Sequence, residues 1–530
     1  MISTAGVILI AGFLAITVLL GFLGYKNTHS TADYLVGGRK MHPFVMALSY
    51  GATFISTAAI IGFGGAAAVF GLGIMWLTAL NIFIGIFIAY VFFGTRTRTM
   101  GQNLDAHTFP ELLGKRYGSQ FLQNAAGFLI FFTMPLYAGS VIIGGITFIV
   151  QSTGIGYDTA LLLFTVLVAV YVVFGGLKGV MYADAFQGAV MFCGMLFLLV
   201  YTYIQLGGFT EAHRALTEMK PDAIAVFGAR GHLGWTSMPA AFSPFWWQLV
   251  SSIILGVGIG VLAQPQLVVR FMSVQSSREL TRALAPGAVF ILVMTGTAYT
   301  VGALSNVYFM RAAGKISIAA AEGKTDSIMP LFITQAMPSW FIPVFFITLI
   351  AAAMSTLSSQ FHTIGTALGR DVLENKIKIH TSPLLVNRIC MCAGIVFSAG
   401  IAYILPRLYT GGTAIIAAGT ALFFGICAAA FLPMYIGTLY LKCASRSAAI
   451  ASFFSGITVS LFWILFVHEK EAAAIGLCTL LTGKAILFPM IAYVNPIVAA
   501  LPVSAIVYGI VTANTNPVEE ETVQKAFQGL

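Results

Sequence analysis

The chain has 530 residues, of which 58% are hydrophobic and only 8% are charged. Soluble domains carry about 25% charged residues, so this composition excludes a soluble globular protein and indicates one that lies in a lipid bilayer. The net charge of +9 comes from residues in short gaps between apolar runs, with no basic stripe interleaved with aromatic residues. We therefore expect no nucleic-acid partner.

Thirteen apolar runs are long enough to cross a bilayer, which takes about 20 residues of α-helix. They lie near 5–25, 43–70, 73–95, 121–151, 157–177, 182–207, 246–268, 284–309, 340–369, 385–405, 412–441, 448–467 and 489–512. The apolar stretch 473–490 is short, and we interpret it as an extracellular loop or half-helix. The hydrophilic stretch 208–245 is too short for a domain, and the polar tail 514–530 is expected to be a solvated end. The sequence thus predicts an all-α integral membrane protein with a single transmembrane domain over 1–530.

The distribution of basic residues predicts the orientation of the chain. An odd number of spans places the two termini on opposite sides of the membrane, and cytoplasmic segments carry an excess of Lys and Arg. With the N-terminus outside, the cytoplasmic segments, including the one with Arg270, hold about twice as many of the 27 basic residues as the other side. We expect a cell (plasma or inner) membrane protein with its N-terminus outside and its C-terminus in the cytoplasm.

Two of the predicted spans contain signals for a broken helix. Residues 48–57 read LSYGATFIST, and residues 256–266 read GVGIGVLAQPQ. The two spans are five apart, so 43–207 and 246–441 would be two five-helix repeats, and an odd number of helices gives them opposite orientations. The segments 1–42 and 442–530 would then be peripheral. The alternative is that glycine is simply common in membrane helices.

Residues 351–360, AAAMSTLSSQ, carry four hydroxyl groups in five residues of an apolar span. At about 100° per residue these hydroxyls cover an arc of about 160° and form two overlapping oxygen clusters. One cluster holds the carbonyl of Ala352 with Ser355 and Thr356, and the other holds Ser355, Ser358 and Ser359. Neutral oxygens suit a monovalent cation that must leave again. The alternative is that the hydroxyls bond to carbonyls of their own helix or join helices together.

Asp184 lies at the cytoplasmic end of the span 182–207, after a short hinge that contains Lys178. An ionisable residue inside a span is a functional candidate by default. Its carboxylate could complete the second oxygen cluster and supply the negative charge that hydroxyls lack. The alternative is a helix cap or an ion pair with Lys178 near the membrane surface.

Four segments carry a resemblance to a known family. They are 33–39 (DYLVGGR), 175–188 (GGLKGVMYADAFQG), 264–272 (QPQLVVRFM) and 354–360 (MSTLSSQ). At these residues the chain resembles the sodium/solute symporter family, nearest to its sodium/proline branch, over nearly its whole length. The resemblance implies a five-plus-five inverted-repeat (LeuT-like) core and solute entry coupled to Na+.

The resemblance also implies where sodium binds. The main site would use the carbonyls of Ala52, Ile55 and Ala352 and the hydroxyls of Ser355 and Thr356. Some members have a second sodium site, and its ligands match Ser355, Ser358, Ser359 and Asp184 in this chain. That match implies two sodium ions per transport cycle.

The predicted solute site lies at the bilayer midplane and consists of Phe54, Ser56, Thr57 and Tyr137. Tyr137 is retained from the sodium/proline branch, but Phe54 stands where that branch has an aspartate and Val257 where it has a tryptophan. The span 121–151 lacks the arginine with which sialic acid carriers of the family hold a carboxylate, which disfavours bulky acidic sugars. The alternative for Phe54 is that it packs against lipid or a neighbouring helix.

These features predict sodium-coupled secondary active symport of a small organic solute into the cell by alternating access. The solute would be an amino acid such as proline or a short monocarboxylate, and the partners would be sodium ions, the solute and the lipid bilayer. The chain has no H-E-x-x-H, no G-x-S-x-G and no carboxylate pair in a span, so we expect no enzyme. The alternatives are an ion channel, which needs a continuous polar stripe, and a transporter-like sensor, which needs a signalling domain.

Overall fold

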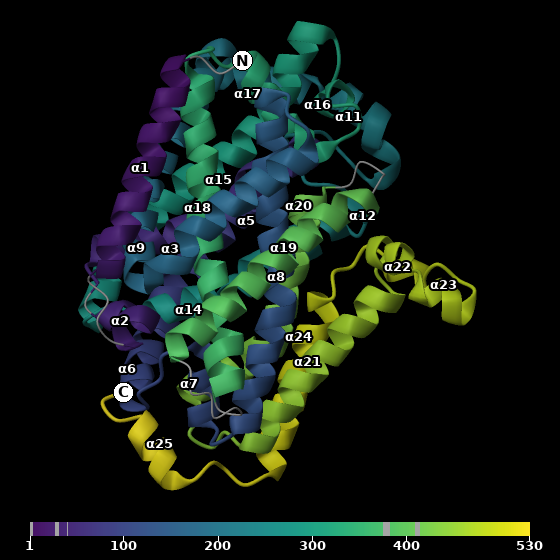
Figure 1. Cartoon of the computed structure of the whole chain (residues 1–530). Coiled ribbons are helices and arrows are strands. Elements are labelled where there is room, and N and C mark those ends of the chain that lie inside the picture. The colour runs from purple at the N-terminus through teal and green to yellow at the C-terminus, as the bar shows by residue number, and fades with distance from the viewer. Residues whose placement is uncertain (1–3, 27–30, 40, 375–381, 409–413) are drawn as a thin grey trace.

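The computed structural model describes residues 4–26, 31–39, 41–374, 382–408 and 414–530. These residues form helices and connecting loops, and their one β-pairing is an isolated bridge between Met41 and Val274. Figure 1 shows the long helices running between two ends of the molecule, with α1 starting at the upper end and α25 lying at the lower end. The described chain therefore starts and ends on opposite sides, as an odd number of spans requires.

Most apolar runs form long helices. Two spanning stretches, Ala58–Asn103 and Pro244–Ala263, consist of consecutive shorter helices, and other short helices join the spans. The long ones include α1 (Thr4–Lys26), α3 (Pro43–Phe54), α8 (Gln120–Thr153), α9 (Tyr157–Gln205), α15 (Ser277–Ala313), α18 (Phe341–Leu368), α19 (Pro383–Leu408), α20 (Ile415–Tyr440), α21 (Arg446–Phe466) and α24 (Ile497–Asn514). The shorter ones are α2 (Thr31–Val36), α4 (Phe63–Phe70), α5 (Met75–Ile82), α6 (Thr95–Asn103), α7 (Phe109–Arg116), α10 (Phe209–Glu218), α11 (Lys220–Phe227), α12 (Pro244–Trp247), α13 (Gly258–Gly260), α14 (Pro265–Phe271), α16 (Ser317–Ala320), α17 (Ile328–Ala336), α22 (Glu469–Ile475), α23 (Leu477–Thr482) and α25 (Glu520–Ala526).

Eleven helical stretches of the described chain are long and apolar enough to cross a membrane, compared with the thirteen predicted spans. The difference lies at 43–70 and 157–177. The first of these is interrupted, and its second half continues into a stretch over residues 58–103. The second contributes only the shorter apolar helix Tyr157–Val170. The lower count therefore reflects a broken helix and a short one, and both predicted segments are helical.

The stretch α9 accounts for two of the predicted spans. Its 49 residues would extend about 74 Å if straight, more than twice the thickness of a hydrocarbon core. The Tyr157 hydroxyl donates to the carbonyl of Ala402, near the end of α19, and the Gln205 amide donates to that of Ala336, just before α18. Helices α18 and α19 pack antiparallel, with Gly369 against Asn387. Ala336 and Ala402 therefore lie on the same side of the molecule, and so do the two ends of α9 that contact them. Hence α9 crosses the molecule twice, as 157–177 and 182–207 predict.

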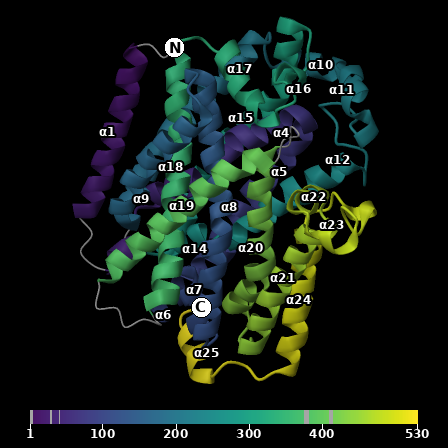
Figure 2. The same ribbon diagram turned by 45° about the vertical axis from the view of Figure 1, so that its right-hand side comes forward.

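The helix with the hydroxyl cluster lies in the centre of the bundle. In the apolar stretch of α18, 89% of the residues are buried, compared with 22% in that of α1 and 22% in that of α24. Helices α3, α8, α9 and α19 all pack against it. Figures 1 and 2 place α1 at one edge of the bundle and the pair α21 and α24 at the opposite edge. Polar residues in α18 are therefore shielded from lipid and must find partners inside the protein.

The first broken helix is interrupted just beyond its glycine. Helix α3 ends at Phe54, Ile55 is extended (φ −93°, ψ 102°), and helical structure resumes in the π-helical segment Ala58–Gly62. Gly51 lies within the helix, where an added Cβ would lie 2.5 Å from Cδ1 of Phe290. The glycine therefore permits close helix packing, and the break itself comes one turn later.

The second broken helix is also interrupted after its glycines. Helical structure continues through Gly260, where an added Cβ would lie 2.6 Å from the carbonyl oxygen of Phe424. The interruption falls at Gln264, which is extended (φ −76°, ψ 114°), and Pro265 begins α14. A proline disfavours helical backbone in the residue before it, so Pro265 is the physical cause of the break.

Two peripheral segments pack onto the bundle. In 208–245, the indole N–H of Trp235 donates to the carbonyl of Ala68 at 2.7 Å, which ties this segment to the end of α4. The prediction of a solvated tail is wrong for α25, because Val523 and Ala526 are buried. The two residues lie three positions apart on one helix face, so a mostly polar segment still has an apolar side to bury. The stretch 473–490 forms the short helix α23 and parts of its neighbours.

Candidate functional site

The interrupted end of α3 meets the hydroxyl groups of α18 in the middle of the protein. The Ser355 hydroxyl donates to the carbonyl of Ala52 at 2.9 Å and to that of Ala352 at 3.3 Å. The Thr356 hydroxyl lies 3.3 Å from the carbonyl of Ala52 and 3.1 Å from that of Thr53. Four of the five oxygens predicted for the main sodium site thus come together, and Ile55 follows directly where the helix stops.

The helix break explains why these carbonyls are available. The last carbonyls of a helix have no N–H partner within it, and they carry the negative end of the helix dipole. Those of Ala52 and Thr53 accept hydrogen bonds from α18 instead. All of these groups are buried, and the described residues contain no cluster of three or more His, Cys, Asp or Glu that could hold a metal. A cluster of uncharged oxygens fits a monovalent cation.

The second predicted oxygen cluster surrounds Asp184. The Ser358 hydroxyl donates to one carboxylate oxygen at 3.2 Å, and the Ser359 hydroxyl lies 3.5 Å from the other. Ser49 and Thr53 of α3 also donate to this second oxygen, at 3.1 and 3.4 Å. The structure therefore brings Asp184, Ser358 and Ser359 together and adds two hydroxyls from α3. The hydroxyl of Ser355, the fourth predicted residue, faces the carbonyls of Ala52 and Ala352 instead.

A guanidinium group that the sequence reasoning missed already pairs with Asp184. Arg270 on α14 donates from Nη2 to Oδ2 of Asp184 at 2.7 Å, and both side chains are buried. The sequence predicts that Arg270 lies in a cytoplasmic segment. The break at Gln264 instead turns α14 into the protein, where the charge must be paired. The sequence signal for this role was a charge within the apolar run LVVRFM. The expected alternative partner of Asp184 was Lys178, whose side chain lies outside the described residues, as do Lys40, Lys376 and Lys378.

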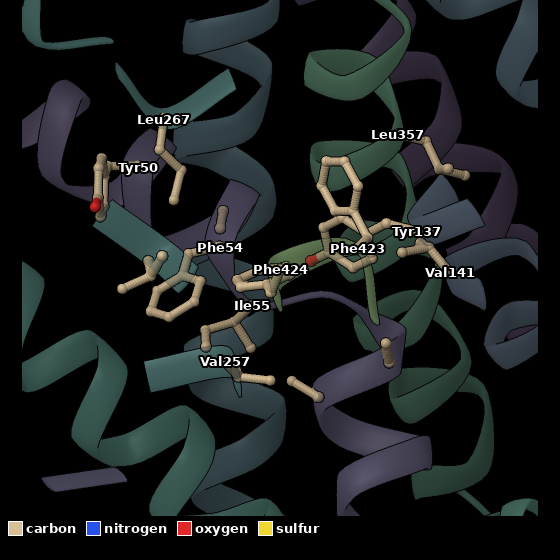
Figure 3. Packing of buried hydrophobic residues seen from close by; sticks show 14 of the residues in the cluster. Tyr50, Phe54, Ile55, Tyr137, Val141, Val257, Leu267, Leu357, Phe423 and Phe424 are labelled. Carbon is tan, nitrogen blue, oxygen red and sulfur yellow. The ribbon is translucent and has the colours of Figure 1, made fainter. Parts of the chain in front are cut away.

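A small cavity lined by buried residues lies beside the helix break. Residues on both sides of the helix break and on the helices packed around it line this cavity: Phe54, Ile55, Ser56, Ala59, Phe63, Asn81, Tyr137, Val257, Tyr299, Thr420 and Phe424. Figure 3 shows Phe54, Ile55, Val257 and Phe424 gathered together, with Tyr137 beside Phe424. The rings of Tyr137 and Phe424 are 5.2 Å apart and perpendicular, and the Tyr137 hydroxyl donates to Ser56 at 3.3 Å. The free volume is about 10 Å³, room for about one water molecule, so a solute enters only if these groups move apart.

Three of the four predicted solute residues, Phe54, Ser56 and Tyr137, line this cavity, and Thr57 does not. The Thr57 hydroxyl donates to the carbonyl of Val141 at 2.6 Å, and its side chain packs against Gly144 of α8. Helical backbone resumes at Thr57 (φ −56°, ψ −28°), so the side chains of Ser56 and Thr57 leave the chain in different directions and face different neighbours.

Asn81 on α5 is a cavity residue that the sequence reasoning did not find. It is buried, and its amide oxygen has no hydrogen-bond partner in the described part of the chain. A buried amide without a partner is costly, so a ligand that supplies a donor would be favoured there. The signal was present, because Asn81 is a lone amide in the apolar run 73–95. Tyr299, Thr420 and Phe424 were also missed, since no sequence pattern indicates which faces of α15 and α20 meet the cavity.

A helix break that faces a buried row of hydroxyls, next to a small buried cavity, is typical of an ion-coupled membrane transporter. The model of the sodium:solute symporter family matches residues 34–456, and the chain belongs to this family. Its function is accordingly the symport of a solute with Na+, as the sequence predicts.

Curated relatives cover most of this chain. It is 29% identical over 475 residues to sodium/proline symporter 2 of Staphylococcus saprophyticus, and the match covers 87% of this chain and 86% of that protein. It is 28% identical over 474 residues to the sodium/proline symporter of Staphylococcus aureus, with the same coverage.

A solved structure confirms the predicted fold class. A Na+-coupled sialic acid symporter, solved in a substrate-bound outward-open state, superposes with a TM-score of 0.74 at 19% sequence identity. The superposition covers 98% of this chain and 99% of that one. The likeness shows a shared LeuT-like helical fold.

Proposed function

We propose that this protein carries a small organic solute into the cell together with sodium ions. The observation that carries the proposal is that neighbouring residues of one interrupted helix serve two sites. The carbonyl of Ala52 faces Ser355, whereas Phe54, Ile55 and Ser56 line the cavity. An ion that fixes Ala52 and Ile55 also fixes the wall of the cavity, so each ligand favours binding of the other.

The cavity lining favours an amino acid such as proline or a short monocarboxylate. It combines apolar and aromatic side chains with the polar groups of Ser56, Asn81 and Thr420, and none of its described residues is Asp, Glu, Lys, Arg or His. A buried carboxylate needs a nearby cation, and sodium at the main site beside Ile55 would supply one. The names of the Staphylococcus relatives support proline as the first solute to test.

Two sodium sites form part of the proposal. The main site would use the carbonyls of Ala52, Ile55 and Ala352 with the hydroxyls of Ser355 and Thr356. The second would use Asp184 with Ser355, Ser358 and Ser359. The Ser355 carbonyl accepts hydrogen bonds from Ser358 at 3.1 Å and Ser359 at 3.2 Å, so a single turn of α18 serves both sites.

The remaining parts of the proposal concern the setting of the protein. It would lie in the cell membrane with its N-terminus outside and its C-terminus in the cytoplasm. Residues 43–207 and 246–441 would form the two inverted repeats, with 1–42 and 442–530 at the periphery. It would move its solute chemically unchanged, as a transporter and not an enzyme, with the lipid bilayer and no nucleic acid as its surroundings.

Uptake into proteoliposomes tests the proposal. Purified protein would be offered radiolabelled proline, other amino acids and short carboxylates, with an inward sodium gradient or a matched potassium gradient. We expect one of these solutes to accumulate under the sodium gradient alone, and protein-free liposomes are the control. Equal uptake in potassium would refute sodium coupling. A large sodium flux without any solute would favour the ion channel.

A further inference from the structure

We propose that Arg270 is a tethered cation that competes with the second sodium ion for Asp184, so that this ion binds only when the guanidinium leaves. The inference rests on the proposed second sodium site. It assigns to Arg270 control over how readily that site fills.

The first observation is the position of one guanidinium nitrogen. Nη2 of Arg270 lies 2.7 Å from Oδ2 of Asp184, 2.5 Å from the hydroxyl of Thr53 and 2.5 Å from that of Ser359. These oxygens come from α9, α3 and α18, and two of them belong to residues of the proposed sodium site. Oxygens hold a calcium ion at about 2.3–2.6 Å, and sodium is similar in size. The nitrogen therefore lies close to where an ion bound by these oxygens would lie.

The second observation is the arrangement of the three oxygens. The hydroxyls of Thr53 and Ser359 are 3.0 Å apart, and they lie 3.4 and 3.5 Å from the carboxylate oxygen. This triangle is compact enough to coordinate one small cation on a face. It is too compact to hold a guanidinium nitrogen and a sodium ion together.

The third observation is burial. Asp184 is 0% exposed and Arg270 is 1% exposed, so water cannot screen either charge. A buried carboxylate needs one compensating cation, and a second positive charge beside it would be uncompensated. Arg270 and sodium are therefore mutually exclusive at Asp184, and the free energy of the ion pair lowers the affinity for sodium.

The remaining contacts of Arg270 show how it could leave. Nε donates to Ser49 at 3.1 Å, and Nη1 donates to the carbonyl of Gln266 on its own helix at 2.8 Å. Helix α14 is only seven residues long and begins at the extended residue Gln264, which can absorb a change in direction. The hydroxyl of Tyr90, whose ring lies 5.5 Å from that of Phe271, is buried without a partner in the described chain. It is an available acceptor for a displaced guanidinium.

Arg270→Gln tests the inference by removing the competing charge. We would measure the thermal stability of the purified protein as sodium replaces potassium, since an ion that binds only the folded state raises its stability. The second, weaker sodium step should move to a sodium concentration about tenfold lower than in the wild type. Arg270→Lys keeps a cation and should shift this step much less. Arg96→Gln is the matched control, because Arg96 donates to the carbonyl of Leu439 away from Asp184.

The double variant Arg270→Gln/Asp184→Asn removes both charges and should lose the second sodium step. A sodium response in Arg270→Gln identical to that of the wild type would overturn the inference. So would an Arg270→Gln protein that folds at no sodium concentration, because sodium would then not replace the guanidinium. Thr356→Ala separates this failure from failure of the proposed function, because Thr356 belongs to the main site alone. It should weaken the first sodium step at least tenfold, whatever Arg270 does.

Discussion

Two oxygen clusters lie one turn apart on α18, and they differ in how their charge is balanced. Around Ser355 and Thr356 the partners are neutral, and the hydroxyls donate to carbonyls at the end of α3. Around Ser358 and Ser359 the partners include the carboxylate of Asp184 and the guanidinium of Arg270. The first cluster has no cation of its own, whereas the second contains one supplied by the chain.

If both proposed sites hold sodium, this difference gives them different tasks. An ion entering the first cluster would displace no charged group and would order the segment that lines the solute cavity. An ion entering the second would have to replace a guanidinium, so its binding would depend on the position of α14. The first site would then couple sodium to the solute, and the second would set the number of ions.

The largest effect is expected in the neutral cluster. Ser355→Ala or Thr356→Ala removes one of about five oxygens around the ion, and sodium affinity should fall at least tenfold, about 1.4 kcal/mol. The sodium dependence of initial uptake rates measures this change. Thr366→Ala is a matched control, because Thr366 lies about three turns along the same helix from Ser355 and its hydroxyl donates to the carbonyl of His362. Wild-type sodium dependence in both variants would remove this site from the mechanism.

The charged cluster should respond in the number of ions. Asp184→Asn keeps the side-chain shape and deletes the charge, so the Hill coefficient for sodium should fall towards one while binding of the first ion stays largely intact. Measurement of reversal potentials gives the sodium-to-solute ratio directly. A wild-type ratio of one would refute the two-ion proposal. A variant that is slow or poorly folded but keeps its ratio would show that Asp184 only anchors the helices around it.

A variant at Phe54 tests whether solute choice can change without a change in sodium affinity. Phe54→Asp changes the chemistry of the cavity wall, and it should alter the choice of solute more than the affinity for sodium. Competition by a panel of unlabelled amino acids and short carboxylates measures that choice. Tyr137→Phe is the companion variant, because it removes only the hydroxyl that donates to Ser56. Unchanged selectivity in both variants would mean that the solute binds elsewhere.

The smallest effect is expected at Asn81. Asn81→Leu removes the amide whose oxygen lacks a partner, and it should weaken solute binding roughly fivefold, about 1 kcal/mol, the value of one hydrogen bond. The half-saturating solute concentration at saturating sodium measures this. Thr57→Val is the matched control, since Thr57 bonds to Val141 outside the cavity. An effect of Thr57→Val on solute binding as large as that of Asn81→Leu would contradict the assigned cavity.

The sequence by itself determined the features that depend on neighbours along the chain. Apolar runs of spanning length, the single face of hydroxyls on α18 and the interruption at Pro265 all follow from local periodicity and backbone sterics. The glycines did not mark the positions of the breaks, since Gly51 and Gly260 lie about one turn before them and permit close helix packing.

Only the tertiary structure decided which side chains meet. Arg270 and Asp184 are 86 positions apart, and no local pattern shows that α14 turns inward to place its charge against α9. The same holds for Asn81 at the cavity, for Thr57 facing α8 and for the buried face of α25. Helix periodicity fixes the face on which a residue lies, but its partner depends on how separate helices pack, and a buried charge or amide takes whichever partner that packing supplies.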